Sequence, residues 1–237
     1  FFTGVTEGNI GSARIIKMLD LRNDKLVVEA KGIYSIENFL MSRRLMYWQV
    51  YLHKTAVAAE KLLIKTFTRA KELSNKGIRL FASPALQFFL EKDVDKYFFE
   101  NNRNEVLRNF VNLDDNDIWC ALKVWTGNED VVLSKLSRCL IDRKLFKTEI
   151  SSEPIDERQI REKINEYMKA FEIGEYEASY FYSSDVITTN MYNEADDSID
   201  ILYNDGTIKD IADASDMLNI NLLSKKVDKH YFSYLRL

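Results

Sequence analysis

The chain has 237 residues, of which 46% are hydrophobic and 30% charged, which provides enough apolar sequence for a core and argues against intrinsic disorder. Its 37 acidic residues outnumber its 33 Lys and Arg, so the net charge of −4 argues against an extended nucleic-acid-binding surface. No apolar run approaches the roughly 18 residues needed to span a bilayer, and no signal peptide is visible. Cys120 and Cys139 form no CxxC pair, so we expect a cytoplasmic protein with two reduced, mostly buried thiols.

The chain opens on FFTGVTEGN, without Met. An apolar aromatic start followed by a turn is typical of the middle of a protein. We therefore expect this chain to be the C-terminal portion of a longer protein.

The first elements are predicted from helical and strand spacing. The positions of Ile15, Ile16 and Leu19 predict a short helix over 12–19. Weak alternation predicts a strand over 24–31, ended by Gly32.

A long helix is predicted next, with Ser35 as its N-cap and its end near Ser74, before Asn75-Lys76-Gly77. At ~1.5 Å per residue it would be on the order of 60 Å long. Because it is apolar on nearly every side between Tyr34 and Leu63, we expect it to be buried on several sides, as the spine of the fold or a subunit interface.

Capping signals predict shorter helices after it. Ser83-Pro84 supplies an N-cap and a Pro at the first helical position, and Asp114, Asp115 and Asp117 place acid at a helix start, where the helix dipole favours it. The predicted helices are Pro84 with ALQFFLEK, 93–101, 104–111, IWCALKVW at 118–125 with the acids at its start, and 130–142.

The composition changes near Pro154. Patterning there predicts an extended segment over 144–151, a helix over 156–171, a strand over 177–186, a hairpin around Asn204-Asp205-Gly206 and a strand over 229–235. We therefore predict a mainly α fold with an α+β C-terminal region: a long central helix in a helical bundle over 1–143, followed by a small antiparallel-sheet domain over 144–237.

Motifs for self-contained catalysis are absent from the sequence. His53 and His230 are the two histidines and stand in no HxxxH, HExxH or His-Asp pattern, so we predict no metal site in this chain. There is no GxSxG, Walker A or GxGxxG motif, and we predict no catalytic residue here.

One cluster of cationic and phenolic groups stands out on the long helix. Arg43, Tyr47, Tyr51 and Lys54 have i, i+4, i+8, i+11 spacing and so lie along one helix face. Arg and Lys bind phosphate, and a tyrosine can stack on a base or sugar. The alternative is structural, with Arg43 paired to an acid such as Glu37 and the tyrosines in the core.

A second basic set is Arg143, Lys144 and Lys147, in the run DRKLFK at a helix-to-strand junction. Its alternative is a group of helix C-terminal cations that favour the helix dipole.

These residues resemble the HD-superfamily phosphohydrolases related to deoxynucleoside triphosphate triphosphohydrolases, including the SAM- and HD-domain dNTPase. FFTGVTEGNIGSARIIKML is similar to the stretch that follows the family's last metal-ligand motif. VEAKGIYSIENFLMSRRLMYWQVYLHKTAVAAEKLL resembles its substrate-side helix, and DRKLFK resembles a short motif at a regulatory nucleotide site. The C-terminal region resembles the extension of the bacterial members.

The resemblance implies roles for particular residues. Arg43, Tyr47, Tyr51 and His53 would lie at the substrate, with Arg43 on the triphosphate, Tyr51 on the sugar and His53 in support. Lys54, Arg143 and Lys147 would bind an activating nucleotide in a homo-oligomer.

The resemblance also implies what this chain lacks. Leu52 stands where the SAM/HD enzyme has a polar residue near the base. The divalent metal of the intact parent would be held by ligands that precede Phe1, so we expect this portion alone to be inactive and to need no cofactor.

Two other function classes remain. The region would be a non-catalytic helical scaffold or oligomerisation module if its cations are held in ion pairs. Single-stranded nucleic-acid binding through Arg, Lys and aromatic side chains is disfavoured by the acidic net charge.

Overall fold

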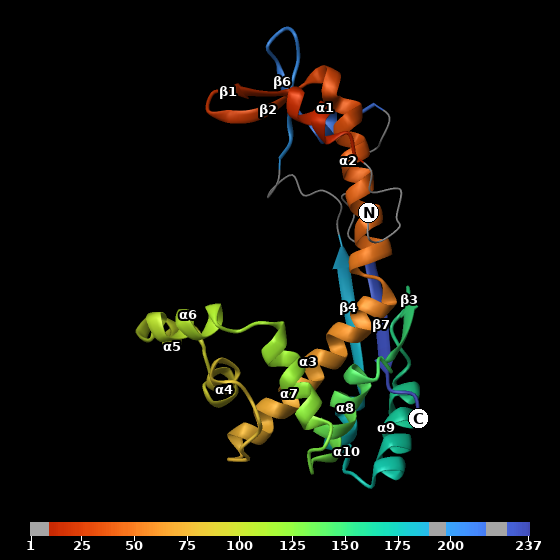
Figure 1. Ribbon diagram of the computed structural model, residues 1–237. Coiled ribbons are helices and arrows are strands. Elements are labelled where there is room, and N and C mark those ends of the chain that lie inside the picture. The colour runs from red at the N-terminus through yellow and green to blue at the C-terminus, as the bar shows by residue number, and fades with distance from the viewer. Residues whose placement is uncertain (1–9, 190–197, 217–226) are drawn as a thin grey trace. The chain divides into compact units, whose positions relative to one another are not determined.

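The computed structural model describes residues 10–189, 198–216 and 227–237 (Figure 1). The chain forms two compact units, unit 1 with residues 1–56 and 186–229, and unit 2 with residues 57–185 and 230–237. The predicted mainly α fold with α+β character is confirmed. The predicted boundary between residues 143 and 144 lies inside unit 2.

Unit 1 contains short helices and a small mixed sheet. Its elements are α1 (Ser12–Lys17), β1 (Leu19–Arg22), β2 (Lys25–Glu29), the 3-10 turn η2 (Ala30–Gly32), α2 (Ile33–Met46), the π-helical turn η3 (Tyr47–Tyr51), β5 (Asp200–Leu202), β6 (Ile208–Asp210) and α11 (Ile211–Ala214).

The sheet of unit 1 has the order β1-β2-β5-β6. The β1–β2 and β5–β6 pairs are antiparallel hairpins, and β2 and β5 join them in parallel through Val28↔Ile201 and Glu29↔Leu202. The sheet is therefore mixed rather than purely antiparallel. Val28 and Ile201 pack with Ile36, Leu40 and Ile211 in the core of this unit.

Unit 2 is mostly helical. Its elements, some of which extend across the division between the units, are α3 (Lys54–Asn75), α4 (Pro84–Glu91), α5 (Lys96–Asn101), α6 (Arg103–Val111), α7 (Asp115–Trp125), α8 (Val131–Ile141), β3 (Lys147–Ser151), α9 (Glu157–Phe171), α10 (Glu175–Ala178), the 3-10 turn η4 (Ser179–Phe181), β4 (Tyr182–Thr189) and β7 (Val227–Tyr234).

Helix α3 supplies one wall of the core of unit 2. Leu62 and Ala70 are fully buried in a cluster that also holds Trp125, Leu136 and Tyr167 from α7, α8 and α9. The strands of the second sheet have the order β3-β7-β4, with β3 and β7 antiparallel from Lys147↔Tyr234 to Ser151↔His230.

The predicted single long helix is interrupted. It begins at Ile33 rather than after Ser35, and α2 ends in η3, where the amide of Leu52 donates to the carbonyl of Tyr47 across five residues at 2.7 Å. A wide turn of this kind breaks the regular i→i−4 ladder, so a new helix, α3, starts at Lys54.

The two cysteines differ in environment. Cys139 in α8 is buried as expected, and burial raises the pKa of its thiol. Cys120 in α7 is exposed, so the prediction of two mostly buried thiols is wrong for this residue.

Candidate functional site

The end of α2 and the turn η3 carry a ladder of one cation and two phenol rings. The guanidinium carbon of Arg43 lies 5.9 Å from the centroid of the Tyr47 ring. Tyr47 and Tyr51 meet edge to face, with centroids 5.4 Å apart. The structure thus brings together three of the four residues that were expected to share a helix face, while Lys54 lies in the next helix.

This ladder is open to solvent within the chain. Residues 43–56 include no buried residue, and Tyr51 is 60% exposed. Burial in α2 is confined to Ile36, Glu37, Leu40 and Ser42. The expectation that the helix is buried on several sides is therefore wrong for residues 43–56, because the core of unit 1 contacts only the first part of α2 and burial resumes at Val57 in α3.

The alternative for Arg43 was an ion pair with an acid such as Glu37. Glu37 is 3% exposed and accepts a hydrogen bond from the hydroxyl of Ser215. Among the ion pairs of the described residues, none includes Arg43. Its guanidinium therefore keeps its donors available for a ligand.

Trp48 makes a second cation–aromatic contact in unit 1 that no local spacing indicates. The ammonium of Lys229 lies 3.9 Å from the centroid of its ring. The two residues are far apart in sequence, and only the tertiary fold brings them together.

His53 and Lys54 stand at the start of α3. The Nδ1 atom of His53 accepts a hydrogen bond from the amide of Thr55 at 3.3 Å, as an N-cap side chain does. Lys54 is exposed. His53 therefore has a local structural role in addition to any contact with a ligand.

Arg143 and Lys147 belong to unit 2, whereas Lys54 belongs to unit 1. Arg143 adopts a left-handed conformation with φ of 56° directly after α8, and the amide of Lys144 donates to the carbonyl of Cys139 at 2.9 Å. This is the geometry of a helix C-cap, which agrees with the structural alternative for its position.

Lys147 is engaged by neighbours on the sheet. Its ammonium pairs with Glu149 and lies 5.4 Å from the ring centroid of Tyr234, whose hydroxyl donates to Glu149 at 2.8 Å. The hydrogen bond that Lys147 donates to Glu149 holds the pKa of Lys147 above its ordinary value.

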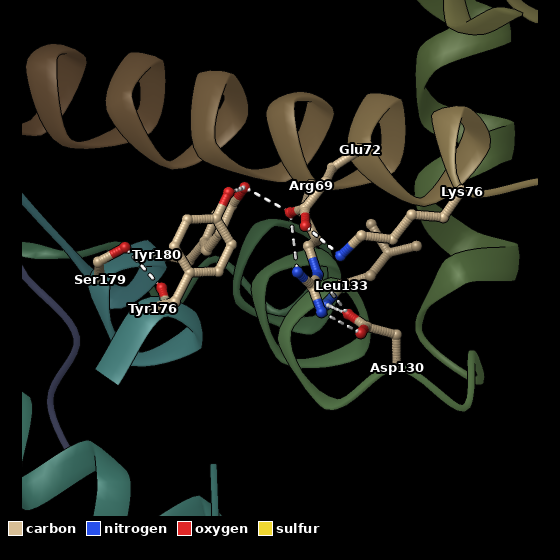
Figure 2. Close-up of polar contacts among 8 residues, drawn as sticks. All are labelled: Arg69, Glu72, Lys76, Asp130, Leu133, Tyr176, Ser179 and Tyr180. Carbon is tan, nitrogen blue, oxygen red and sulfur yellow. Dashed lines mark hydrogen bonds and ion pairs between the residues drawn. The ribbon is translucent and has the colours of Figure 1, made fainter. Parts of the chain in front are cut away.

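A polar network centred on Arg69 of α3 was not predicted (Figure 2). Arg69 is 5% exposed and forms a bidentate pair with Asp130, with Nε–Oδ1 and Nη2–Oδ2 distances of 3.1 and 2.6 Å. Its Nη1 atom donates to Glu72 at 2.8 Å, and Glu72 also accepts from the hydroxyl of Tyr180 and pairs with Lys76.

The electrostatics of this network favour the charged forms of Arg69 and Glu72. Burial alone would raise the pKa of Glu72, but hydrogen bonds from Lys76, Tyr180 and Arg69 outweigh it and lower the pKa to about 2. The bond to Asp130 raises the pKa of Arg69. Burial and the adjoining tyrosine and carboxylate raise the pKa of Tyr180.

Two more cations of α3 continue the same row. Lys61 pairs with Asp185 at 3.2 Å, and Lys65 donates to the carbonyl of Ser179 at 3.1 Å. Burial lowers the pKa of Lys65. Since these cations have protein partners, the row joins α3 to the η4–β4 segment and offers no open phosphate site.

Sequence reasoning missed Arg69 because its partners are distant in the chain. One signal was present: Leu62, Thr66, Arg69 and Leu73 share a face of α3 at i, i+4, i+7 and i+11. An arginine on a buried helix face requires an acidic partner.

A cavity of about 610 Å³ lies on the sheet of unit 1. Two ion pairs, Asp20–Arg22 and Glu29–Lys31, stand among its lining residues. It includes none of the site residues predicted from the sequence.

Residues 10–189, 198–216 and 227–237 contain no group of three or more His, Cys, Asp or Glu that could hold a metal ion. The helices of this same part of the chain are all too short or too polar to cross a membrane.

Comparisons with known proteins give a family context. Residues 10–94 match the HD associated region. The Bacillus subtilis (strain 168) protein named "Uncharacterized protein YwfO" is 30% identical over 203 residues, which cover 86% of this chain and 41% of that protein.

Two solved structures match this chain over all or nearly all of its length. A crystal structure of a phosphohydrolase from Bacteroides thetaiotaomicron VPI-5482 is 62% identical, with a TM-score of 0.93, and the match covers 100% of this chain and 58% of that one. A hypothetical protein from Aquifex aeolicus, 20% identical with a TM-score of 0.58 over 98% of this chain and 50% of its own, shares the fold.

The chain spans about two fifths of the curated relative, 58% of the first solved relative and half of the second. The predicted resemblance is confirmed at the level of the HD associated region and of a phosphohydrolase-like relative. Residues 10–94 thus match the HD associated region, and the chain is similar to a protein named phosphohydrolase.

Proposed function

We propose that this chain is the C-terminal portion of a metal-dependent HD phosphohydrolase that acts on nucleotides, with dNTPs as the substrate class. Arg43, Tyr47, Tyr51 and His53 form the substrate side, with the guanidinium on the phosphates and a phenol ring on the sugar. The divalent metal is held by residues outside this chain, so no residue of this portion is assigned to it.

The ladder formed by Arg43, Tyr47 and Tyr51 is the observation that supports this proposal most directly. The guanidinium of Arg43 forms no ion pair within the described residues, and the ring of Tyr51 is 60% exposed. A solvent-accessible guanidinium beside phenol rings can bind phosphate and stack on a sugar or base at the same time. The similarity to a protein named phosphohydrolase supports the reaction class.

Arg43 has a defined part in the proposed chemistry. Water attacks a phosphorus centre, negative charge grows on the phosphoryl oxygens, and the guanidinium stabilises that charge with donors already in place. Arg43→Ala in the longer protein should lower kcat/KM for a dNTP by about 10²-fold, as the loss of one transition-state donor does.

Arg44→Ala is the matched control, because it removes the same charge one residue further along the helix. We expect it to leave kcat/KM within a few-fold of wild type. Equal kcat/KM values for the two variants and the wild type would contradict the assignment of Arg43 to the substrate site.

The proposal assigns Lys54, Arg143 and Lys147 to an activating nucleotide in a cytoplasmic homo-oligomer. Titration of the longer protein with a nucleoside triphosphate should show binding that both Lys54→Ala and Arg143→Ala weaken. Binding that neither substitution changes would contradict this assignment.

A helical scaffold or oligomerisation module is the second candidate. The exposed rings of Tyr47 and Tyr51 favour it, since aromatic side chains of this kind also anchor protein interfaces. Loss of self-association on Tyr51→Ala, with no nucleotide binding by the longer wild-type protein, would favour this candidate over the first.

A further inference from the structure

The turn η3 receives a cation from the last residue of unit 1. The ammonium of Lys229, in strand β7, lies 3.9 Å from the centroid of the Trp48 ring. Trp48 follows Tyr47 directly within η3, so Lys229 contacts the same turn that carries the rings of Tyr47 and Tyr51 beside Arg43. The fold therefore adds to this turn a cation that the sequence places far away.

The charge of Lys229 is not balanced by the protein around it. Among the ion pairs of the described residues, none includes Lys229. The adjacent acid, Asp228, accepts a hydrogen bond from the hydroxyl of Thr188 at 2.6 Å, and successive side chains of a strand point to opposite faces. Residues 38–59, which contain η3, include no Asp or Glu. A half-buried cation in these surroundings favours an anion supplied by a ligand.

The indole of Trp48 holds the ammonium of Lys229 without neutralising it. The face of an aromatic ring attracts a cation electrostatically but carries no net charge. A lysine ammonium has several N–H donors, and those turned away from the ring stay available for a ligand. Because the stem of a lysine is otherwise flexible, the contact with the ring also reduces the freedom that is lost when a phosphate binds.

We infer that Lys229 is a second phosphate-binding residue of the proposed substrate site and that Trp48 positions its ammonium. A nucleoside triphosphate carries negative charge on each of its linked phosphate groups, which one guanidinium does not neutralise. Arg43 and Lys229 come from different elements, α2 and β7, and both contact aromatic rings of η3. They are therefore suited to bind different phosphates of one triphosphate chain.

This inference deepens the proposed function and rests on its assignment of η3 to the substrate. Arg43 is assigned to the charge that develops in the transition state, whereas Lys229 binds a phosphate equally in the bound substrate and in the transition state. Loss of such uniform binding raises KM and leaves kcat unchanged. The two cations are therefore distinguished by the kinetic constant that each one affects.

Steady-state kinetics of the longer protein with a dNTP test the inference. Lys229→Met removes the charge and keeps an apolar stem, so KM should rise about tenfold at unchanged kcat, as on the loss of one charge-assisted hydrogen bond. Lys229→Arg, which keeps a cation that stacks on rings, should recover most of this loss. Lys209→Met is the matched control, because the ammonium of Lys209 lies 5.5 Å from the ring centroid of Tyr203 in the same unit. It should leave KM unchanged.

Titration of the same protein with inorganic tripolyphosphate, without metal, gives a readout besides activity. Binding should change the fluorescence of the wild type, because the ammonium beside the indole gains an anionic neighbour, and Trp48→Phe should lose that part of the change. Lys229→Met should raise the Kd about tenfold. Trp48→Leu removes the ring and keeps the charge, so it should raise the Kd about threefold, as on the loss of a cation–aromatic contact.

The results separate this inference from the proposed function. If Arg43→Ala lowers kcat/KM while Lys229→Met changes neither KM nor the Kd for tripolyphosphate, the inference is wrong and the proposed function stands. If Arg43→Ala also leaves the kinetics unchanged, the proposed function fails with it. Should Lys229→Met fail to fold, Trp48→Leu carries the test, and an unchanged Kd for tripolyphosphate would then overturn the inference.

Discussion

Asp130 does two things at once at the start of α8. Its Oδ1 atom caps the helix by accepting from the amide of Leu133 at 2.8 Å, and both of its carboxylate oxygens hold the guanidinium of Arg69. Only the first role is visible in the sequence around residue 130. The second depends on a residue 61 positions earlier.

Asp130→Ala should therefore lower the free energy of unfolding by more than the loss of an ordinary capping residue does. It leaves Arg69 buried with Glu72 as its remaining acidic partner, and breaking a buried pair costs on the order of 3 kcal/mol. The control is Asp156→Ala, which removes the N-cap of α9, where the side chain is exposed and accepts from Arg158. That change should cost about 1 kcal/mol, and urea unfolding compares the two. Equal costs would mean that the pair with Arg69 adds no stability.

Glu72 makes stability depend on pH in the acid range. Its pKa in the folded protein is about 2, below its ordinary value of 4.5. A carboxyl group with a lowered pKa stabilises the fold fully above pH 4.5, and the contribution is lost as the pH falls towards 2. The difference corresponds to about 3 kcal/mol.

Unfolding of the wild type and of Glu72→Gln at a series of pH values measures this contribution. The gap between their free energies of unfolding should be widest above pH 4.5 and should narrow as the pH falls to about 2. A gap that stays constant over this window would contradict the lowered pKa.

At the scale of elements, the break between α2 and α3 is the largest departure from prediction. The apolar pattern runs through residues 34–63 without a Pro or Gly, so no local residue pattern predicts the break. The π-helical turn η3 precedes it, and the Nδ1 atom of His53 then caps α3.

His53→Ala should destabilise the first turn of α3 by about 1 kcal/mol, while His53→Asn keeps a side-chain acceptor and should restore that loss. Amide hydrogen exchange at Thr55 reports directly on this bond. If the Asn variant exchanges as fast as the Ala variant, the cap is not what His53 contributes.

Elements with local signals were predicted well. Ser83 before Pro84, the capping box of Asp114 and Asp117, and the turn at Gly206, whose φ is 85°, each specify a boundary within a few residues. Two other segments were missed or misassigned, although β1 pairs with its neighbour β2 in a local hairpin. Strand β1 was not predicted, and residues 177–181 form α10 and η4 instead of a strand.

The residues of the candidate site show the same contrast between local signals and distant contacts. Arg43, Tyr47 and Tyr51 are neighbours on one helix, so spacing was sufficient to place them together. The contact of Trp48 with Lys229 and the bond of Glu72 with Tyr180 join residues more than a hundred positions apart, and no spacing rule reaches that far.

At the scale of the whole molecule, each unit is built from two separate stretches of the chain. Residues 230–237 belong to unit 2, where Tyr231 and Phe232 are 2% exposed. The carbonyl of Leu235 accepts from the buried hydroxyl of Tyr167 at 2.8 Å, and its amide donates to Phe181.

A chain that ends at residue 229 should therefore lose the cooperative unfolding of unit 2. Removing a large buried side chain costs about 3–5 kcal/mol, and several such losses approach the whole stability of a domain, about 5–15 kcal/mol. Removal of residues 236–237, which are exposed, is the control and should leave the thermal midpoint nearly unchanged. A sharp native-like transition in the shorter chain would contradict this expectation.

The division into interleaved stretches also sets an order of events during synthesis. The ribosome delivers α3 to α10 before residues 230–237, so their core lacks Leu235 until the chain beyond β7 has been made. Unit 1 in turn waits for β5, which pairs with β2 across some 170 residues. Each unit therefore completes its core only after its second stretch of chain has been made, and the helices of the first stretch carry exposed apolar faces until then.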